Sequence, residues 1–181
     1  MDNLDKYLLL ALPAHPFLGA LILLALPNSK SALIHRYART IVCLGIVLAG
    51  YFFVNYNPAN SEAQFFSEFS WLSSVGIQFS SGLTGIAAPL ILLNGIVFFA
   101  AVFISKGIAE RPKEFYVLLM LLAAGVYGVF ISLDLFFFFF FYELAVVPMY
   151  LLIGVWGSST DFTTFVRTKE YGAMKLTLYL V

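Results

Sequence analysis

Long apolar runs alternate with short polar segments along the whole chain of 181 residues. A helix that crosses a membrane needs roughly 17–25 mostly apolar residues, and five runs are long enough. These runs cover residues 7–26, 39–56, 82–105, 114–133 and 135–156. A sixth run opens near Tyr171 and continues to Val181. The pattern predicts an all-α polytopic membrane protein with about five complete transmembrane helices and the start of a sixth.

The longest connection, residues 57–81, contains a different period. Its apolar residues Val75, Ile77 and Phe79 alternate with Gly76, Gln78 and Ser80. A period of two residues is typical of a half-buried strand, so we expect a short hairpin within this connection. No internal repeat divides the chain, and residues 1–181 are predicted to form a single membrane domain.

Lysine and arginine are concentrated in alternate connections. Of the ten basic residues, eight lie in the connections after the first, third and fifth runs: Lys30, Arg36, Arg39, Lys106, Arg111, Lys113, Arg167 and Lys169. Lys6 is the one basic residue on the opposite side. Cytoplasmic connections carry the excess of positive charge in membrane proteins. We therefore expect the N-terminus and the 57–81 connection to face away from the cytoplasm.

The composition supports a membrane protein and excludes several kinds of site. The chain is 61% hydrophobic and 11% charged, whereas soluble domains are about 25% charged. Its net charge is zero, so no overall field favours nucleic acid. Cys43 is the single cysteine, which excludes an internal disulfide and a thiolate-held cluster. With only His15 and His35 besides, and no glycine-rich nucleotide motif, we expect this chain to bind no cofactor or metal.

Glu143 is an ionisable residue inside the fifth apolar run. It follows Asp134 by nine residues, which at 1.5 Å per residue places it about 13–14 Å deeper, near the middle of a ~30 Å hydrocarbon core. A charge at that depth costs roughly 2.5–3.5 kcal/mol, and desolvation favours the protonated form of a carboxyl group. Intramembrane acids usually line ion or substrate paths, so Glu143 is predicted to carry protons. The alternative is a carboxylate that a neighbouring helix satisfies.

Three other residues are candidates for supporting Glu143. Pro148 lacks an N–H, so it should bend the helix and leave the Leu144 carbonyl available. Tyr150 lies two turns beyond Glu143 on the same face and offers a hydroxyl group. Lys175 either extends to the membrane surface or is an electrostatic partner along an ion path.

Two further features are assigned structural roles. His15 lies between two prolines of the first run and is predicted to be hydrogen-bonded within the protein. The phenylalanine run, residues 136–141, is predicted to contact lipid and neighbouring helices.

The part of the chain that contains Glu143 and Lys175 resembles a known family. Residues 143–157, ELAVVPMYLLIGVWG, closely resemble the fifth helix of subunit M, the chain 4 homologue, of the proton-translocating NADH–quinone oxidoreductases known as respiratory complex I. Residues 171–179, YGAMKLTLY, are similar to the start of its sixth helix. Residues 77–90, IQFSSGLTGIAAPL, are similar to the entry into its third helix.

The resemblance implies the N-terminal portion of an antiporter-like fold of about fourteen helices. It implies a membrane-arm subunit, in the cell inner (plasma) membrane, that couples electron transfer to proton translocation. Glu143 matches the family's fifth-helix glutamate, which is paired with a seventh-helix lysine, and Lys175 matches a recurring sixth-helix lysine. NADH, FMN, iron–sulfur clusters and quinone would belong to partner subunits. One departure is Thr84, where relatives usually have the aspartate of a Gly-x-Asp-Gly motif.

A subunit of a multi-subunit cation/proton antiporter is the alternative. Such proteins share the glutamate of the fifth helix. Residues 148–157, PMYLLIGVWG, favour the oxidoreductase branch.

Overall fold

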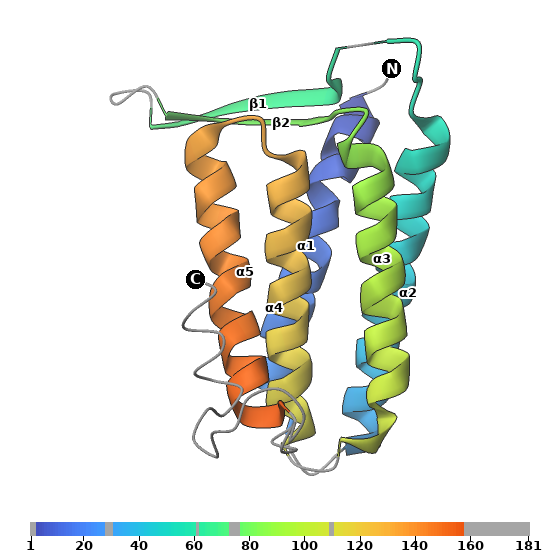
Figure 1. Cartoon of the computed structure of the whole chain (residues 1–181), viewed down its shortest axis with the longest axis vertical. Helices are drawn as coiled ribbons and strands as arrows, with labels where there is room; N and C mark the ends of the chain where they lie inside the picture. The colour runs from blue at the N-terminus through green and yellow to red at the C-terminus, as the bar shows by residue number, and fades with distance from the viewer. Residues whose placement is uncertain (1–2, 28–30, 61, 73–76, 109–110, 158–181) are drawn as a thin grey trace, which may run out of the picture.

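Five long helices stand side by side, and a pair of strands crosses one end of them (Figure 1). The structure is a computed structural model that describes residues 3–27, 31–60, 62–72, 77–108 and 111–157. The helices are α1 (Asn3–Ala25), α2 (Ser31–Asn55), α3 (Ala87–Ile104), α4 (Pro112–Ile131) and α5 (Leu135–Trp156). The other elements are β1 (Gln64–Leu72), β2 (Ile77–Leu83) and a 3₁₀ turn, η1 (Ser105–Gly107).

All five helices are long and apolar enough to cross a membrane. They run alternately up and down, so the N-terminus lies at the end that the strands cover (Figure 1). The predicted all-α polytopic membrane fold is thereby confirmed for these helices. The predicted sixth helix lies outside the described residues.

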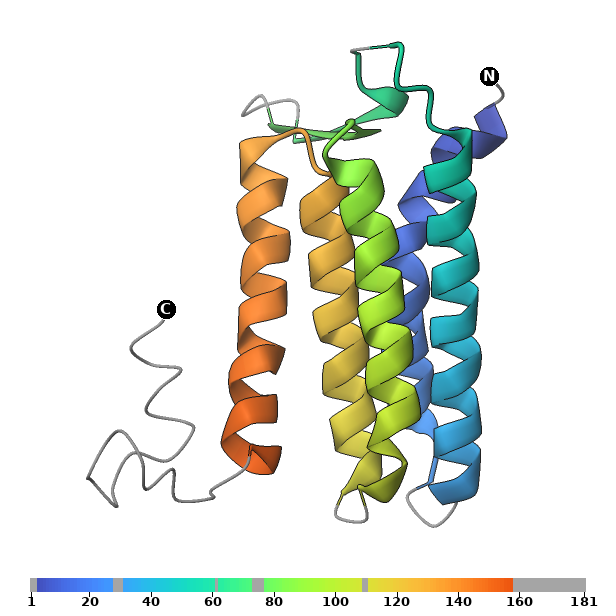
Figure 2. The same cartoon turned by 45° about the vertical axis from the view of Figure 1, so that its right-hand side comes forward.

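Helix α4 is the central element of the bundle because it packs against each of the other four long helices. Helix α1 packs on α4 and α2, and α3 packs on α2 and α4. Helix α5 packs chiefly on α4 and stands at the edge of the bundle (Figure 2). One whole side of α5 is therefore left without a helical neighbour among the described residues.

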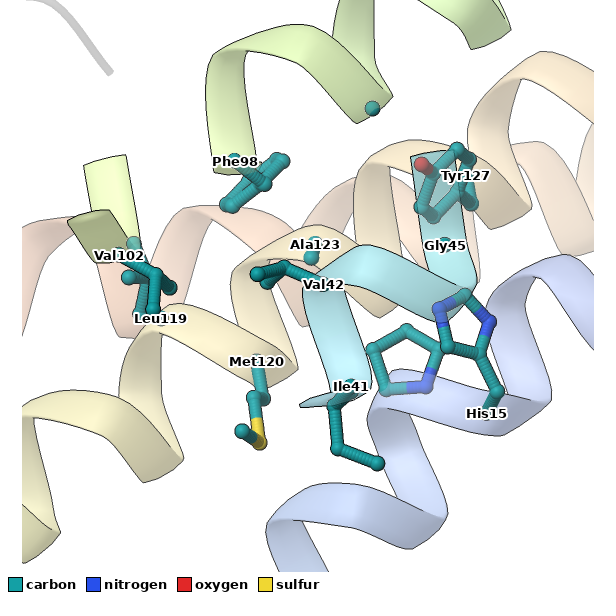
Figure 3. A pocket seen from close by; sticks show the side chains of 12 residues that line it. His15, Ile41, Val42, Gly45, Phe98, Val102, Leu119, Met120, Ala123 and Tyr127 are labelled. Atoms are coloured by element: carbon teal, nitrogen blue, oxygen red, sulfur yellow. The ribbon is translucent and has the colours of Figure 1, made fainter. Parts of the chain in front are cut away.

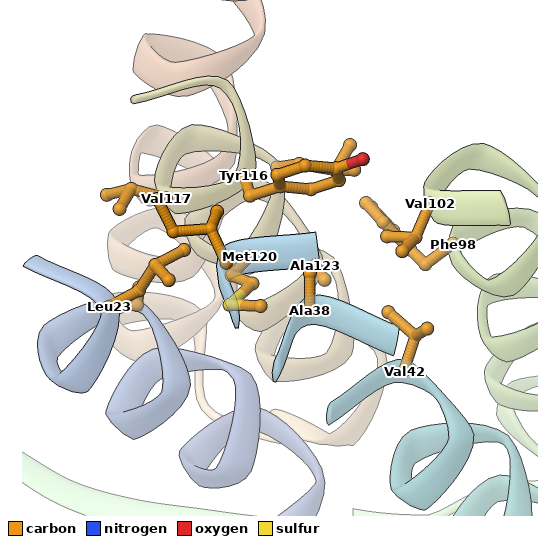
Figure 4. Packing of buried hydrophobic residues seen from close by; sticks show 12 residues of the cluster. Leu23, Ala38, Val42, Phe98, Val102, Tyr116, Val117, Met120 and Ala123 are labelled. Carbon is orange, nitrogen blue, oxygen red and sulfur yellow. The ribbon is translucent and has the colours of Figure 1, made fainter. Parts of the chain in front are cut away.

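Two clusters of buried residues hold α1 to α4 together. One lies in the half of the bundle away from the strands, where alanines such as Ala38 and Ala123 face larger residues such as Met120 (Figure 4). The other lies toward the strands and includes Phe52, Leu83 and Tyr127. Small residues let membrane helices approach closely, and the resulting van der Waals packing drives their association because the lipid is as apolar as the side chains.

The second helix begins eight residues earlier than predicted. The predicted start was residue 39, but α2 begins at Ser31, so Arg36 and Arg39 are helical and not in a connection. The first turns contain polar residues and do not read as an apolar run. They are helical because Ile34 and Ala38, one turn apart, are buried against the bundle while Arg36 stays exposed.

The third helix begins later than predicted, at Ala87 and not at residue 82, because residues 82 and 83 belong to β2 and residues 84–86 form a turn. Strands β1 and β2 pair antiparallel, with Phe69 opposite Phe79 and Ser67 opposite Ser81. The hairpin is fixed to the bundle where the Leu133 N–H donates to the Ser80 carbonyl at 2.9 Å. The Phe79 ring also lies 4.6 Å from the Phe137 ring of α5.

A bulge in β1 directs an aromatic side chain into the bundle. Phe65 has a φ of 56°, a left-handed conformation that a bulky residue rarely adopts. The strand register shifts between Gln64 and Ser67, and the Phe65 ring packs 5.1 Å from that of Phe52. Burial of the ring compensates for the unfavourable backbone conformation, so the bulge anchors the hairpin to α2.

Hydrogen bonds tie the helices together at the end opposite the hairpin. The ammonium group of Lys113 donates to the carbonyls of Leu24 and Leu26 at 2.6 and 2.7 Å. Carbonyls at a helix C-terminus have no partner in their own helix, so Lys113 supplies one and its charge also suits the helix dipole. Nearby, His35 Nδ1 is 2.9 Å from the Tyr116 hydroxyl, which donates to the Ser105 carbonyl at 3.1 Å.

Helices α4 and α5 approach closely because two glycines of α4 face α5. A Cβ atom on Gly125 would lie 2.7 Å from the backbone nitrogen and 2.8 Å from the Cβ of Ala145. A Cβ atom on Gly128 would overlap the ring of Phe141. The two residues on α5 are one turn apart, so this contact fixes which face of α5 is turned toward α4.

We predict that Lys113→Met destabilises the protein by about 1.5–3 kcal/mol, the range for hydrogen bonds to charged groups. The reason is that the carbonyls of Leu24 and Leu26 lose their donor. Thermal unfolding in lipid nanodiscs would measure the change. Lys106→Met is the control, since it removes an exposed lysine at the same end. Equal effects of the two substitutions would contradict the prediction.

We predict that Gly125→Ala destabilises the bundle by about 1–3 kcal/mol through overpacking. The new methyl group meets the backbone of Ala145, which cannot rotate away, so α4 and α5 must separate. Adding Ala145→Gly should therefore restore only part of the stability. Gly107→Ala should be neutral in the same unfolding assay, because no atom lies within 4 Å of the position of the added methyl group.

Candidate functional site

Glu143 lies on the face of α5 that is turned away from α4. Residues Phe137, Ala145 and Pro148 form the buried face. With 3.6 residues per turn, Glu143 falls on the opposite side of the helix from these residues, and its side chain is exposed. Its neighbours on that side are also open, namely Phe139, Phe140 and Val147. The candidate site is therefore a carboxylate on an aromatic and aliphatic surface.

The depth of Glu143 follows from the start of α5. The Asp134 carboxylate accepts hydrogen bonds from the backbone N–H groups of Phe136 at 2.8 Å and Phe137 at 3.1 Å, which caps the helix. Helix α5 is 22 residues long, and nine residues at 1.5 Å separate Asp134 from Glu143, or about 13–14 Å. The carboxylate thus lies close to the middle of a spanning helix.

No described residue forms a hydrogen bond or an ion pair with the Glu143 carboxylate. The one ion pair among the described residues joins Arg111 and Glu114 at the bundle end away from the hairpin. The carboxylate therefore has no protein neighbour that stabilises its charge in this part of the chain. The packing alternative, in which a neighbouring helix satisfies the acid, has no support among α1 to α4.

The other predicted site residues are placed differently. Pro148 is buried on the α4 side, and α5 continues without a break from Leu135 to Trp156. Tyr150 is partly buried and lies on the same side as Glu143, about 10 Å along the helix by its seven-residue spacing. No hydrogen bond joins the two among the described residues. Lys175 lies outside the described residues, so its predicted role stays a prediction.

The charged residues of the described chain are separated between the two ends of the bundle. Arg36, Arg39, Lys106, Arg111 and Lys113 lie at the end away from the hairpin. Asp5, Glu62, Glu68 and Asp134 lie at the hairpin end, with Lys6 as the basic exception there and Glu114 as the acidic exception at the other end. Glu143 sits between these two layers. The described chain therefore places one carboxylate in the apolar middle of the bundle, far from either layer.

No group of three or more His, Cys, Asp or Glu side chains in the described part of the chain could hold a metal ion. Thr84, the predicted departure from the motif that the resemblance implies, has its own local partners. Its hydroxyl accepts the N–H of Ala87 at 3.3 Å, and its carbonyl accepts the N–H of Ala88. Thr84 thus satisfies donors at the start of α3, a role that an aspartate at this position could also fill.

The structure reveals polar groups inside the bundle that the sequence did not single out. Asn94 of α3 is buried, and its amide nitrogen has no partner among the described residues. Tyr127 of α4 is buried beside Gly45 and Gly95. His15 is hydrogen-bonded, as predicted, with Nδ1 at 3.0 Å from the Ala11 carbonyl. Gly45 and Gly95 are the sequence features that could have indicated this buried region, since each makes room for a large side chain of another helix.

Comparison with known proteins relates the chain to one group of curated relatives. No protein-family model matches it. It is 36% identical over 172 residues to NAD(P)H-quinone oxidoreductase chain 4 3 of Picosynechococcus sp., covering 94% of this chain and 30% of that protein. It is 32% identical over 167 residues to chain 4-2 of Synechocystis sp., covering 92% and 28%. It is 33% identical over 165 residues to the chloroplastic chain 4 of Chara vulgaris, covering 91% and 32%.

A solved structure has the same fold. It is the structure of the membrane-bound sulfane sulfur reductase, described as an archaeal respiratory membrane complex. The TM-score is 0.65 at 21% identity, over 96% of this chain and 32% of the matched chain. The likeness at this identity shows the fold alone.

The matches cover nearly all of this chain, but the chain spans only about a third of the length of the relatives. The resemblance to subunit M that the sequence suggested is confirmed. The chain is a homologue of NAD(P)H-quinone oxidoreductase chain 4 along nearly its whole length.

Proposed function

We propose that the chain acts as a membrane-arm subunit of a proton-translocating NADH:quinone oxidoreductase and that Glu143 takes up and releases a proton within the membrane. The observation that carries the proposal is a carboxylate halfway along a spanning helix, on a face turned away from α4 and without a bonding partner among the described residues. The homology to chain 4 proteins supports the assignment to such a complex.

The chemistry that this position favours is a change between a neutral and a charged carboxyl group. In hydrocarbon the neutral acid is favoured, whereas a nearby cation or water favours the carboxylate. A change in water access or in the distance of a cation would therefore drive proton uptake and release. Lys175 is the proposed partner further along the ion path within this chain, at a different depth from Glu143, and Tyr150 offers a hydroxyl on the same side of α5.

The redox steps are assigned to other subunits. This chain has one cysteine and two histidines, too few ligands to hold a thiolate-bound iron–sulfur cluster by itself. NADH, FMN, iron–sulfur clusters and quinone would accordingly be bound by partner subunits of the membrane and peripheral arms. The contribution of this chain would be the movement of protons.

The proposed location is the cell plasma membrane, with the N-terminus and the hairpin on the non-cytoplasmic side. The support is the separation of charge, since five of the six described basic residues lie at the end away from the hairpin. That end would face the cytoplasm.

We predict that Glu143→Gln reduces proton translocation by the assembled complex about tenfold or more, because a positioned proton-transfer group typically contributes roughly 10²–10⁴-fold. Glu143→Asp should retain part of the activity, since it keeps the carboxyl group and changes only its reach. Proton uptake by inside-out vesicles during NADH oxidation is the measurement. Glu68→Gln is the matched control because it makes the same chemical change on the exposed hairpin.

Unchanged proton translocation by Glu143→Gln in a fully assembled complex would contradict the role of Glu143. The antiporter alternative has its own signature in the same vesicles. It predicts a sodium-dependent pH change without NADH oxidation and no co-purification with NADH-oxidising subunits. The named relatives favour the oxidoreductase.

We predict that single cysteines report the orientation of the bundle. In a Cys43→Ala background, Glu62→Cys should react in intact cells with a maleimide that cannot cross membranes. Gly107→Cys, at the opposite end, should react only after the cells are opened. Both positions are exposed, so the difference reflects the side of the membrane and not burial. The reverse labelling pattern would show the opposite orientation.

A further inference from the structure

A small cavity lies between α1, α2, α3 and α4, away from Glu143 (Figure 3). Its volume is about 10 Å³, close to the minimum that one water molecule needs. Most of its wall is apolar, but His15 and Tyr127 contribute polar groups. No residue of α5 lines it, so it is separate from the site proposed for proton transfer.

The hydroxyl group of Tyr127 reaches this cavity without a partner from the protein. Tyr127 is only 2% exposed, and its hydroxyl forms no hydrogen bond with any described residue. The hydroxyl oxygen lies beside two glycines. A Cβ atom placed on Gly95 would be 3.1 Å from this oxygen, and a Cβ atom placed on Gly45 would be 3.6 Å from it. A buried hydroxyl group is unfavourable unless it is hydrogen-bonded.

His15 presents a second unpaired group to the same place. A carbonyl can only accept a hydrogen bond, so His15 Nδ1 must carry the proton that it donates to the Ala11 carbonyl at 3.0 Å. In the neutral ring, Nε2 then has a free lone pair. The position of a Cβ atom on Gly45 lies 2.8 Å from Nε2, and His15 and Tyr127 lie on either side of this glycine (Figure 3).

Both polar groups lie beside the same glycine, Gly45. The ring centroids of His15 and Tyr127 are 6.0 Å apart, and no direct hydrogen bond joins the two side chains. A buried water typically has two to four polar partners, and this cavity supplies them.

We propose that one water molecule binds in this cavity, accepts a hydrogen bond from the Tyr127 hydroxyl and donates one to His15 Nε2. The bond from Nδ1 to Ala11 fixes the direction of donation, from Tyr127 through the water to His15. The water would connect α1 with α4 across the glycine of α2. It would form a polar link in the core of the bundle.

The first test is a density map of the complete protein in its native complex, at a resolution that shows ordered water. One peak should lie within hydrogen-bond distance of both His15 Nε2 and the Tyr127 oxygen. Tyr127→Phe, which removes only the hydroxyl, should abolish the peak. Gly45→Ala should also abolish it, because the methyl group would lie 2.8 Å from Nε2. Gly50→Ala, on the same helix with nothing within 4 Å, should keep it.

A second measurement does not depend on seeing the water. Nitrogen-15 solid-state NMR of labelled histidine should show His15 protonated at Nδ1, with an Nε2 resonance that shifts when Tyr127 is changed to Phe and stays in place in Gly50→Ala. An empty cavity in the wild-type protein would overturn the proposal. So would a peak and an Nε2 resonance that both survive Tyr127→Phe unchanged.

Discussion

The contact between α4 and α5 determines where the intramembrane carboxylate points. Gly125 and Gly128 have no side chains, so Ala145 and Phe141 lie directly against the backbone of α4. A helix whose face is fixed at two positions one turn apart cannot rotate about its axis. Glu143, on the opposite side, is therefore held away from α4, and any group that exchanges protons with it must approach from that side.

The depth of the carboxylate is fixed by different interactions, at the hairpin end. Asp134 caps the first turn of α5, Leu133 bonds to β2, and Phe79 of the hairpin packs on Phe137. Each of these contacts opposes sliding of α5 along its axis. Rotation and translation of α5 are thus set by separate parts of the fold, and together they place one carboxyl group near the middle of the membrane.

Much of this arrangement could be predicted from the sequence because the hydrocarbon core of a membrane restricts which backbone structures can cross it. A run of apolar residues must be helical in a membrane, since each backbone group needs an internal partner. Hence α5 was predicted with the bounds that the structure shows, Leu135–Trp156, and the position of Glu143 along it follows from counting residues. The same rule misplaced the start of α2, because residues 31–38 include polar side chains yet are helical, with Ile34 and Ala38 buried against the bundle.

Contacts between distant segments were beyond the reach of such rules. Lys113 is hydrogen-bonded to Leu24 and Leu26, which lie 89 and 87 positions earlier in the chain. No local sequence pattern specifies these contacts. Burial of Tyr127 beside Gly45 likewise depends on how four helices pack. Pro148 is buried within the continuous helix α5, and the bend predicted there stays a prediction. Pairing between helices, unlike their number and order, is decided by side-chain shape on both partners.

The cavity at His15 and Tyr127 and the surface at Glu143 differ in which groups can stabilise their polar side chains. His15 and Tyr127 face each other inside four packed helices, so a single water can complete their hydrogen bonds. Glu143 faces outward among phenylalanines, and a charged carboxylate in contact with lipid at that depth is costly. Either further protein must therefore cover this face of α5, or Glu143 must be in its neutral, protonated form. This chain spans only about a third of the length of its chain 4 relatives. A covering group that carries a positive charge would favour the carboxylate, and its withdrawal would favour the acid, which is the alternation that proton transfer requires.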